Sequence, residues 1–230
     1  MTVVDLTVTN EAAKRPMSHH IERLLNLGYT GRDEAAVRAH IDELADEGIS
    51  GPNEVPTLYP KPNHLVSTGG TFEVMSNRTS GEAEFVLLSE ADRTYVGVGS
   101  DHTDREIESE SISLAKAVCP NVMGDSVWQL STVEDHWDEL ELRSWVTNDG
   151  DRVRYQEATV AEIRSPEDLL DIAADRMTAP LEGTAVFGGS VATETDGFVC
   201  GERFEVELHD PILDRTLYSE YDVEPISWIG

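Results

Sequence analysis

A β-hairpin in the middle of the chain is the feature that most constrains its fold. Residues 83–88, apart from Glu84, and residues 95–98 are apolar, and the residues between these two segments are mostly polar. If Leu88 pairs with Tyr95, the alternation of side chains along each strand places one apolar set on a single face. That set consists of Ala83, Phe85, Leu87, Val96 and Val98. We therefore expect this face of the hairpin to pack against the core.

Three acidic side chains come together on the opposite face in the same register. Glu82 and Glu84 flank one alanine, and Glu82 falls opposite Asp101. Like charges placed opposite one another destabilise a sheet, so a cation is expected between them. Carboxylate oxygens suit Mg²⁺, Mn²⁺ or Ca²⁺. Gly97 and Gly99 carry no side chain, and we expect them to leave this face open to a ligand.

Two alternatives to a metal site stay open at this point. The chain has 45 acidic residues, and a Glu-x-Glu pair on a half-exposed strand can be an ordinary solvated surface. A slip of one residue in the strand pairing would also send Asp101 to the other face.

The charge of the chain argues against several classes of partner. Its 230 residues include only 17 Lys and Arg, and the formal net charge is -28. Phosphates and anionic membrane surfaces would be repelled, so we expect neither a nucleic-acid partner nor a membrane partner. The lysines are Lys14, Lys61 and Lys116, and every other cationic residue is arginine. This acid-rich, lysine-poor composition indicates adaptation to high salt, from which we infer a halophilic host.

The first 50 residues predict a small N-terminal cap region. Val3–Val8 alternate as a short strand, and residues 11–27 are loosely amphipathic but contain a proline. Asp33–Glu47 carry apolar residues at helical spacing. We expect this cap at 1–50 and the main domain at 51–230.

The location of the protein is predicted from two further features of the sequence. The N-terminus lacks the basic start and apolar middle of a signal peptide. No apolar run approaches the length that spans a bilayer. We expect a cytoplasmic protein.

Beyond residue 50 the pattern is mainly one of strands. Besides the hairpin, strands are expected at 65–67, 71–75, 127–133, 139–146, 153–163, 184–187, 203–208 and 217–223. Asn148-Asp149-Gly150 is a strong turn signal. Helices are expected at 106–119 and from Pro166 to about Met177, after an N-cap at Ser165. Many strands and few helices indicate an α+β fold rather than a doubly wound sheet.

Six short motifs follow one another in a recognisable order, namely Pro56–Pro62, Gly81–Glu84, Val96–Glu106, Ala115-Lys116, Gly188–Ser190 and Gly201–Glu207. In these motifs and their order the sequence resembles the fumarylacetoacetate hydrolase family. The resemblance covers residues 52–225 and indicates an uncharacterised branch. Three departures stand out. Ser100 replaces the usual Asn, Ala115 replaces the usual Gly, and the family's N-terminal lid with its catalytic His–Glu pair has no convincing match.

The resemblance implies a β-rich mixed β-sandwich roll and a metal-dependent hydrolase or lyase. Members of the family act on 2-keto or 1,3-dicarbonyl acids by C–C hydrolysis, hydration, decarboxylation or isomerisation, and they commonly form homodimers. The resemblance implies Mg²⁺, or Mn²⁺ or Ca²⁺, held by Glu82, Glu84 and Asp101. It also implies that Lys116 stabilises an enolate or oxyanion.

Four further side chains are candidates for the site. His102 could act as a general base or be a hydrogen-bonded histidine beneath the site, and His136 is a second candidate base. Arg105 offers a fork that fits a substrate carboxylate, although a salt bridge is the alternative. Ser190 could contact the same carboxylate or be a turn residue. The unmatched lid leaves a second function open, a non-catalytic protein of this fold that binds a metal or a dicarboxylate.

Overall fold

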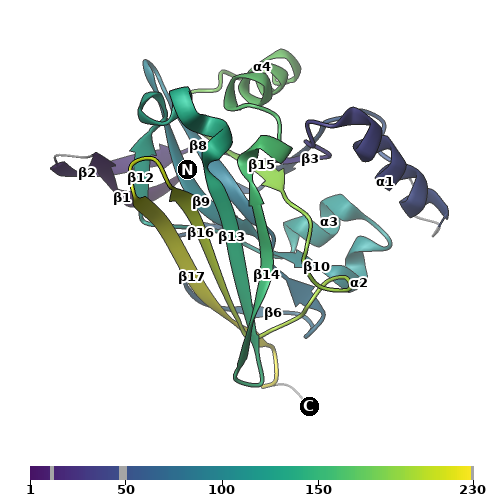
Figure 1. Cartoon of the computed structure of the whole chain (residues 1–230). Coiled ribbons are helices and arrows are strands. Elements are labelled where there is room, and N and C mark those ends of the chain that lie inside the picture. The colour runs from purple at the N-terminus through teal and green to yellow at the C-terminus, as the bar shows by residue number, and fades with distance from the viewer. Residues whose placement is uncertain (11–12, 47–50, 229–230) are drawn as a thin grey trace.

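Strands dominate the computed structural model, which describes residues 1–10, 13–46 and 51–228 (Figure 1). The larger sheet has ten strands and runs β2-β1-β12-β9-β8-β15-β3-β4, with β11 pairing β9 and β5. These strands are β1 (Thr2–Asn10), β2 (Ala13–Ile21), β3 (Arg23–Gly28), β4 (Thr57–Lys61), β5 (Val66–Ser67), β8 (Ala83–Glu90), β9 (Arg93–Asp101), β11 (Asn121–Met123), β12 (Ser126–Gln129) and β15 (Thr184–Ser190). The predicted strand-rich α+β fold is confirmed.

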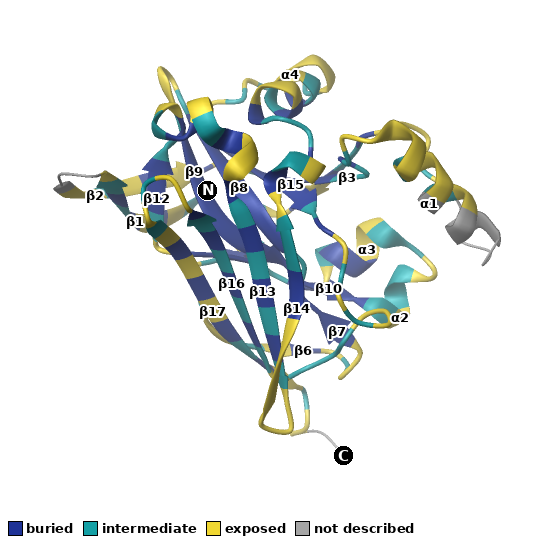
Figure 2. Ribbon diagram, in the orientation of Figure 1, coloured by how far each residue is buried: buried dark blue, intermediate teal, exposed yellow. Residues whose placement is uncertain are grey.

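A second sheet of five strands runs β14-β13-β16-β17-β6. It contains β6 (Gly70–Val74), β13 (Glu141–Asn148), β14 (Asp151–Thr159), β16 (Arg203–Asp210) and β17 (Arg215–Pro225). Buried and more exposed residues alternate along β16 and β17 (Figure 2). One face of this sheet therefore meets the core and the other meets solvent. A short pair is formed by β7 (Thr79–Ser80) and β10 (Thr103–Asp104).

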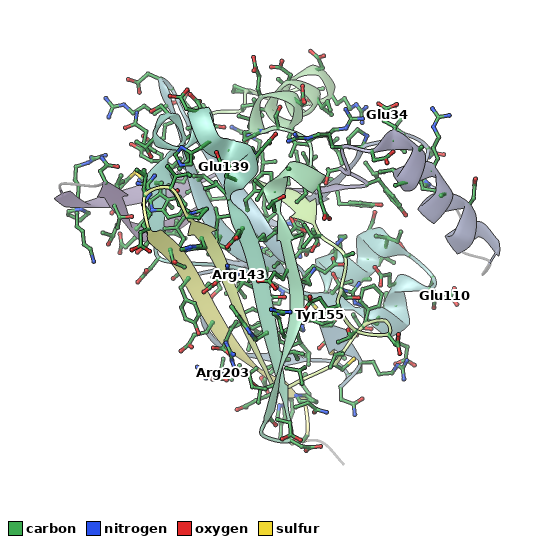
Figure 3. All side chains as sticks on the ribbon, viewed as in Figure 1. Glu34, Glu110, Glu139, Arg143, Tyr155 and Arg203 are labelled. Carbon is green, nitrogen blue, oxygen red and sulfur yellow. The ribbon has the colours of Figure 1, made fainter. Side chains whose placement is uncertain are left out.

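The solvent face of the second sheet carries pairs of arginines and carboxylates. Arg143 donates to Glu157 at 3.1 Å and to Glu207 at 2.8 Å. Arg203, further along the sheet, donates to Asp222 at 3.2 Å (Figure 3). Most of the acidic side chains on this face are therefore neutralised locally, although isolated exposed pairs stabilise a fold little.

The central hairpin has the predicted register. Leu88 pairs with Tyr95, and Glu84 pairs with Gly99. The predicted apolar face of the hairpin lies in a cluster that also contains Leu142, Val206 and Leu208 of the second sheet. The two sheets are therefore joined by a shared core, which buries this face of the hairpin.

The opposite face of the hairpin is also buried. Val86 and Leu88 pack in a cluster with Val4, Leu6 and Met123, all from the ten-stranded sheet. Because both this hairpin and the distant strand β1 contribute to one cluster, the sheet curls around it, as expected of a roll. Strand β8 is covered on both faces, so Glu84, which lies within it, enters an interior rather than a surface.

In the described part of the chain, four α-helices and several short turns of 3-10 helix complete the fold. The α-helices are α1 (Glu34–Asp46), α2 (Arg105–Glu108), α3 (Ile112–Ala117) and α4 (Pro166–Arg176). The 3-10 turns are η1 (Asn63–Leu65), η2 (Leu130–Thr132), η3 (Glu134–Glu139) and η4 (Val160–Glu162). The expected cap holds at Ser165, whose side chain accepts from the Asp168 N–H. Among the described residues, no helix is both long and apolar enough to cross a membrane.

Several predictions about local structure were wrong. The strands expected at 127–133 and 153–163 end at Gln129 and Thr159, where the 3-10 turns η2 and η4 follow. Residues 13–28 form strands β2 and β3 instead of an amphipathic segment. Pro16 is accommodated because β2 pairs only with β1 and lies at the edge of the sheet. The single helix expected at 106–119 is divided into α2 and α3, because Ser111 adopts an extended conformation and caps the second helix.

The N-terminal residues are integrated with the rest of the chain. Strands β1, β2 and β3 all belong to the ten-stranded sheet, and α1 lies outside the two sheets. Glu47, the last residue of the segment with helical spacing, lies outside the described residues. The boundary at residue 50 stays a prediction.

The predicted hairpin turn is confirmed. Asp149 and Gly150 adopt positive φ angles of 50° and 82° between β13 and β14. Both central residues of a type I′ turn require such angles, which Gly adopts without steric cost.

Candidate metal centre

The three predicted carboxylates lie together at one end of the central hairpin. Oxygen atoms of Glu82, Glu84 and Asp101 lie within 4.8 Å of one another. The backbone fixes this arrangement, because the Asp101 N–H donates to the Glu82 carbonyl at 3.0 Å and extends the pairing of β8 and β9. Asp101 is fully buried and the Glu82 side chain is 20% exposed. The predicted grouping is therefore present, while the role of the three residues as metal ligands stays a prediction.

Gly97 and Gly99 do not leave the face open, and this expectation was wrong. A Cβ atom at Gly99 would lie 2.6 Å from the Val122 carbonyl oxygen and 2.8 Å from the Phe187 ring. At Gly97 it would contact Val127 and Met123. Glycine is needed at position 99 because a neighbouring strand and an aromatic ring approach the hairpin closely there, whereas the contacts at position 97 are ordinary packing distances. Any ligand must therefore reach the carboxylates from the end of the hairpin.

Two lysines contact the carboxylates. The Lys116 ammonium donates to Asp101, and it donates to Glu82 at 3.3 Å. The Lys61 ammonium donates to the other oxygen of Asp101 at 3.2 Å. Lys61 is the site residue that our sequence reasoning missed. The signal was present, because a chain with only three lysines places two of them here.

The electrostatics of the site differ from one carboxylate to the next. Burial raises the pKa of Asp101, but the ammonium groups of Lys116 and Lys61 outweigh burial and hold it at about 2. Burial and the charge of Asp101 raise the pKa of Glu84 well above its usual value, although Glu84 accepts from the Gly189 N–H at 2.9 Å. A divalent cation here would oppose this increase in the pKa of Glu84, because metal ligands must be deprotonated.

Arg105 lies beside Glu82 at the start of α2. Its guanidinium donates to Ser80 at 2.7 Å and to Glu108 at 2.8 Å, and its third nitrogen lies 3.3 Å from Glu82. The Phe198 ring covers the guanidinium, with 3.6 Å between Cζ and the ring centroid. The salt bridge that was the alternative for Arg105 is therefore present, while its contact with a substrate carboxylate stays a prediction.

The ring of His102 is held among aromatic side chains. Asp101 and His102 are consecutive, so their side chains leave the chain in opposite directions. The ring packs edge-on against Phe72, Phe204 and Tyr221, and its Nδ1 lies 3.1 Å from the Tyr221 hydroxyl. Burial and the charge of Arg105 lower the pKa of His102 to about 3. This placement matches the alternative of a buried histidine beneath the site. The general-base role stays a prediction that the placement does not support.

The remaining candidates have partners of their own. Ser190 accepts from the Gln156 amide at 2.7 Å and donates to the Ala83 carbonyl at 2.9 Å. Its hydroxyl therefore supports the strand between the glutamates, and contact with a substrate stays a prediction. His136 lies 3.0 Å from Asp210, outside the carboxylate group. Two surface depressions, of about 480 Å³ and 420 Å³, lie away from the three carboxylates. Of the residues that contact these carboxylates, only Lys61 lines one of the depressions, the second.

Comparison with solved structures finds the same fold in other proteins. 2-Keto-3-deoxy-D-arabinonate dehydratase complexed with magnesium and 2,5-dioxopentanoate has a TM-score of 0.60 at 14% identity, over 90% of this chain and 74% of that chain. A putative fumarylacetoacetate hydrolase family protein from Yersinia pestis CO92 has a TM-score of 0.60 at 17% identity, over 87% of this chain and 93% of that chain. 4-Oxalocrotonate decarboxylase from Pseudomonas putida G7, complexed with calcium and acetate, has a TM-score of 0.55 at 14% identity, over 88% and 76%.

These likenesses establish that the fold is of the fumarylacetoacetate hydrolase type, as the sequence motifs implied. No curated protein matches the chain. A family model matches residues 27–221, which is most of the chain, and its description is "Protein of unknown function (DUF2848)". The chain therefore belongs to this DUF2848 family, and it has the fumarylacetoacetate hydrolase fold.

Proposed function

We propose that this chain is a divalent-metal-dependent hydrolase or lyase that acts on a small 2-keto or 1,3-dicarbonyl acid. The observation that carries the proposal is the cluster of Glu82, Glu84 and Asp101, whose oxygens lie within 4.8 Å in the interior beside two lysines. A set of three carboxylates fits Mg²⁺, Mn²⁺ or Ca²⁺. Two structural neighbours, a dehydratase with magnesium and a decarboxylase with calcium, support this class of chemistry.

The charges of the site fit an anionic substrate held against a cation. Four carboxylates, those of Glu82, Glu84, Asp101 and Glu108, meet three cationic side chains, Lys61, Lys116 and Arg105. With all seven groups ionised, the site has a net charge of -1, and a divalent cation would change this to +1. A bound ion of this kind polarises a keto carbonyl and orients the adjacent carboxylate. The resulting positive charge favours a keto acid over a neutral carbonyl compound.

Lys116 is suited to stabilise negative charge on the substrate. Burial lowers the pKa of Lys116, but the charges of Asp101, Glu82 and Glu84 outweigh burial and raise it above the usual value for lysine. A lysine that stays protonated cannot accept a proton, but it can stabilise an enolate or oxyanion. Arg105 also stays charged and offers donors toward a substrate carboxylate from the other side of Glu82.

A metal analysis and a substrate panel test this proposal. Purified wild-type protein is expected to bind Mg²⁺, Mn²⁺ or Ca²⁺, and the Glu82→Ala/Asp101→Ala double variant to bind none. Metal-dependent turnover is expected with at least one member of a panel of acylpyruvates, oxaloacetate and 2-oxo-enoates. Equal metal content in the two proteins would refute the metal site. Metal binding without turnover across the panel would favour a non-catalytic binding protein.

A further inference from the structure

Gln156 of β14 uses its whole side-chain amide to hold the peptide between the two glutamates. The Ala83 N–H donates to Gln156 Oε1 at 2.9 Å, and Gln156 Nε2 donates to Ser190 Oγ at 2.7 Å. The Ser190 hydroxyl in turn donates to the Ala83 carbonyl at 2.9 Å. Ser144 Oγ donates to Oε1 at 2.9 Å and Nε2 donates to the Val191 carbonyl at 2.6 Å. Both donors and both acceptor positions of the amide are therefore occupied.

These bonds fix the orientation of the amide. A rotation of the Gln156 amide by 180° would bring its NH₂ group against the Ala83 N–H, so that two donors would face each other. Gln156 is only 1% exposed and Ser144 only 2%, so water cannot replace the lost bonds. One arrangement of the ring of bonds around Ala83 is therefore strongly preferred.

A β-bulge directs Gln156 toward this position. The pairing of β13 with β14 shifts after Ser144, which lies opposite Gln156, and Tyr155 is left without a partner on β13. As a result two consecutive residues, Tyr155 and Gln156, are both buried, which the alternation of a regular strand would forbid. Bulges commonly redirect a side chain in this way beside functional sites.

The amide takes the place of a neighbouring strand. Strand β15 ends at Ser190, which lies opposite Glu84, and its pairing with β8 is irregular just before that point. Ala83 precedes Glu84 in β8. Its N–H and its carbonyl bond to the side chains of Gln156 and Ser190 instead of to the backbone of a neighbouring strand. The hydrogen bonds of a sheet are thus continued across the position that separates Glu82 from Glu84.

We propose that Gln156 is a positioning residue for the carboxylate centre, acting through the backbone of Ala83. This inference rests on the proposed function, because it assumes that the carboxylates bind a divalent ion. When the Ala83 peptide is fixed, Glu82 and Glu84 leave the strand at a defined distance and direction from Asp101. Gln156 itself belongs to the second sheet, so docking of the two sheets sets the geometry of the centre.

The test is the affinity of the full-length metal-free protein for Mn²⁺, measured by titration calorimetry well below the melting temperature. Gln156→Met keeps the volume of the side chain but removes the amide, and we expect it to weaken Mn²⁺ binding about 10–100-fold, the usual effect of losing a partner of a metal ligand. Ser190→Ala removes the bond to the Ala83 carbonyl and one bond of the Gln156 amide, but it leaves the Ala83 N–H bonded to Gln156. It should therefore weaken binding in the same direction but less.

Two variants serve as controls. Ser144→Ala removes a bond to the same Oε1 atom without touching Ala83, so its loss of Mn²⁺ affinity should be smaller than that of Gln156→Met. Leu169→Ala creates a cavity at a fully buried position on α4, a helix with no residue in the centre. It should lower the melting temperature and leave the Mn²⁺ dissociation constant unchanged, which separates positioning from general destabilisation.

The outcomes distinguish this inference from the proposed function. Wild-type Mn²⁺ affinity in both Gln156→Met and Ser190→Ala would overturn the positioning role while the metal site stood. If Gln156→Met does not fold, Ser190→Ala alone decides, and wild-type affinity in it overturns the role. Absence of Mn²⁺ binding by the wild-type protein would overturn the proposed function, and the positioning role with it.

Discussion

Replacing Asp101 with asparagine should make the stability of the metal-free protein less dependent on pH. The pKa of Asp101 is about 2, because two buried ammonium groups outweigh the effect of burial. In the unfolded chain the value is about 3.9. A depressed pKa stabilises the folded state above the unfolded value, and this stabilisation is lost as pH falls from about 5 toward 2. The two pKa values differ by nearly two units, which corresponds to about 2.5 kcal/mol of stabilisation of the folded state at pH 7.

Asparagine resembles the protonated form of this side chain, so Asp101→Asn should lack this stabilisation at every pH. At pH 7 we expect it to be less stable than wild type by about 2.5 kcal/mol, which for a chain of this size lowers the melting temperature by about 5–10 °C. The difference between the two proteins should shrink steadily as pH falls below 5.

The assay is urea unfolding in the presence of a chelator at several pH values between 3 and 7. Asp92→Asn is the matched control, because Asp92 is 75% exposed and its carboxylate meets water in both states. This control should follow the wild type throughout. If the stability difference between wild type and Asp101→Asn stayed constant from pH 7 to pH 3, the lysines would not be holding the Asp101 charge in the folded state, and the reasoning would be refuted.

Further predictions concern the same site and the whole chain. Burial raises the pKa of Glu84, so ionisation of this side chain destabilises the folded state as pH rises above the unfolded-state pKa of about 4.3. Metal-free Glu84→Gln should therefore have a higher melting temperature than the wild type at pH 7. The same variant should lose Mn²⁺ binding in calorimetry. Lys61→Met leaves the buried Asp101 carboxylate with one cationic partner fewer, and it should lower the free energy of unfolding in urea by about 3 kcal/mol. The control Lys14→Met, at an exposed position, should change this free energy by less than about 0.5 kcal/mol. Unfolding temperature should rise between low and molar NaCl, because screening weakens the repulsion of a chain with net charge -28; a fall would contradict the inferred halophilic adaptation. Sedimentation should give twice the chain mass of 25.4 kDa if the expected homodimer forms, and the mass of one chain would contradict it.

The parts of the fold that were predictable are those in which one local pattern decides the structure. The register of the central hairpin followed from its apolar residues and its polar link. The turn at Asp149-Gly150 followed from residue types that tolerate positive φ. Strand β3 was missed because four consecutive residues, Leu24–Leu27, are buried on two faces and show no alternation. Its neighbours β15 and β4 are distant in sequence, so only tertiary structure identifies it.

The site was predictable in its carboxylates but less so in their surroundings. The spacing of Glu82, Glu84 and Asp101 on paired strands was sufficient to bring them together. Strand alternation alone indicated that His102 would point away from Asp101, and the sequence analysis gave this rule too little weight. Gln156 could not be found in this way, because a bulge reverses the alternation that sequence reasoning assumes.

Two edge strands of the ten-stranded sheet contain a proline. Pro16 lies in β2 and Pro60 lies in β4, which are the first and last strands of the sheet's main path. Proline has no N–H to offer an incoming strand, so each edge resists extension by another molecule. An acidic surface keeps molecules apart only while its charges are felt, and concentrated salt reduces their reach to a few ångströms. The lack of a hydrogen-bond donor does not depend on ionic strength, so these two residues would still oppose strand pairing at β2 and β4 in brine.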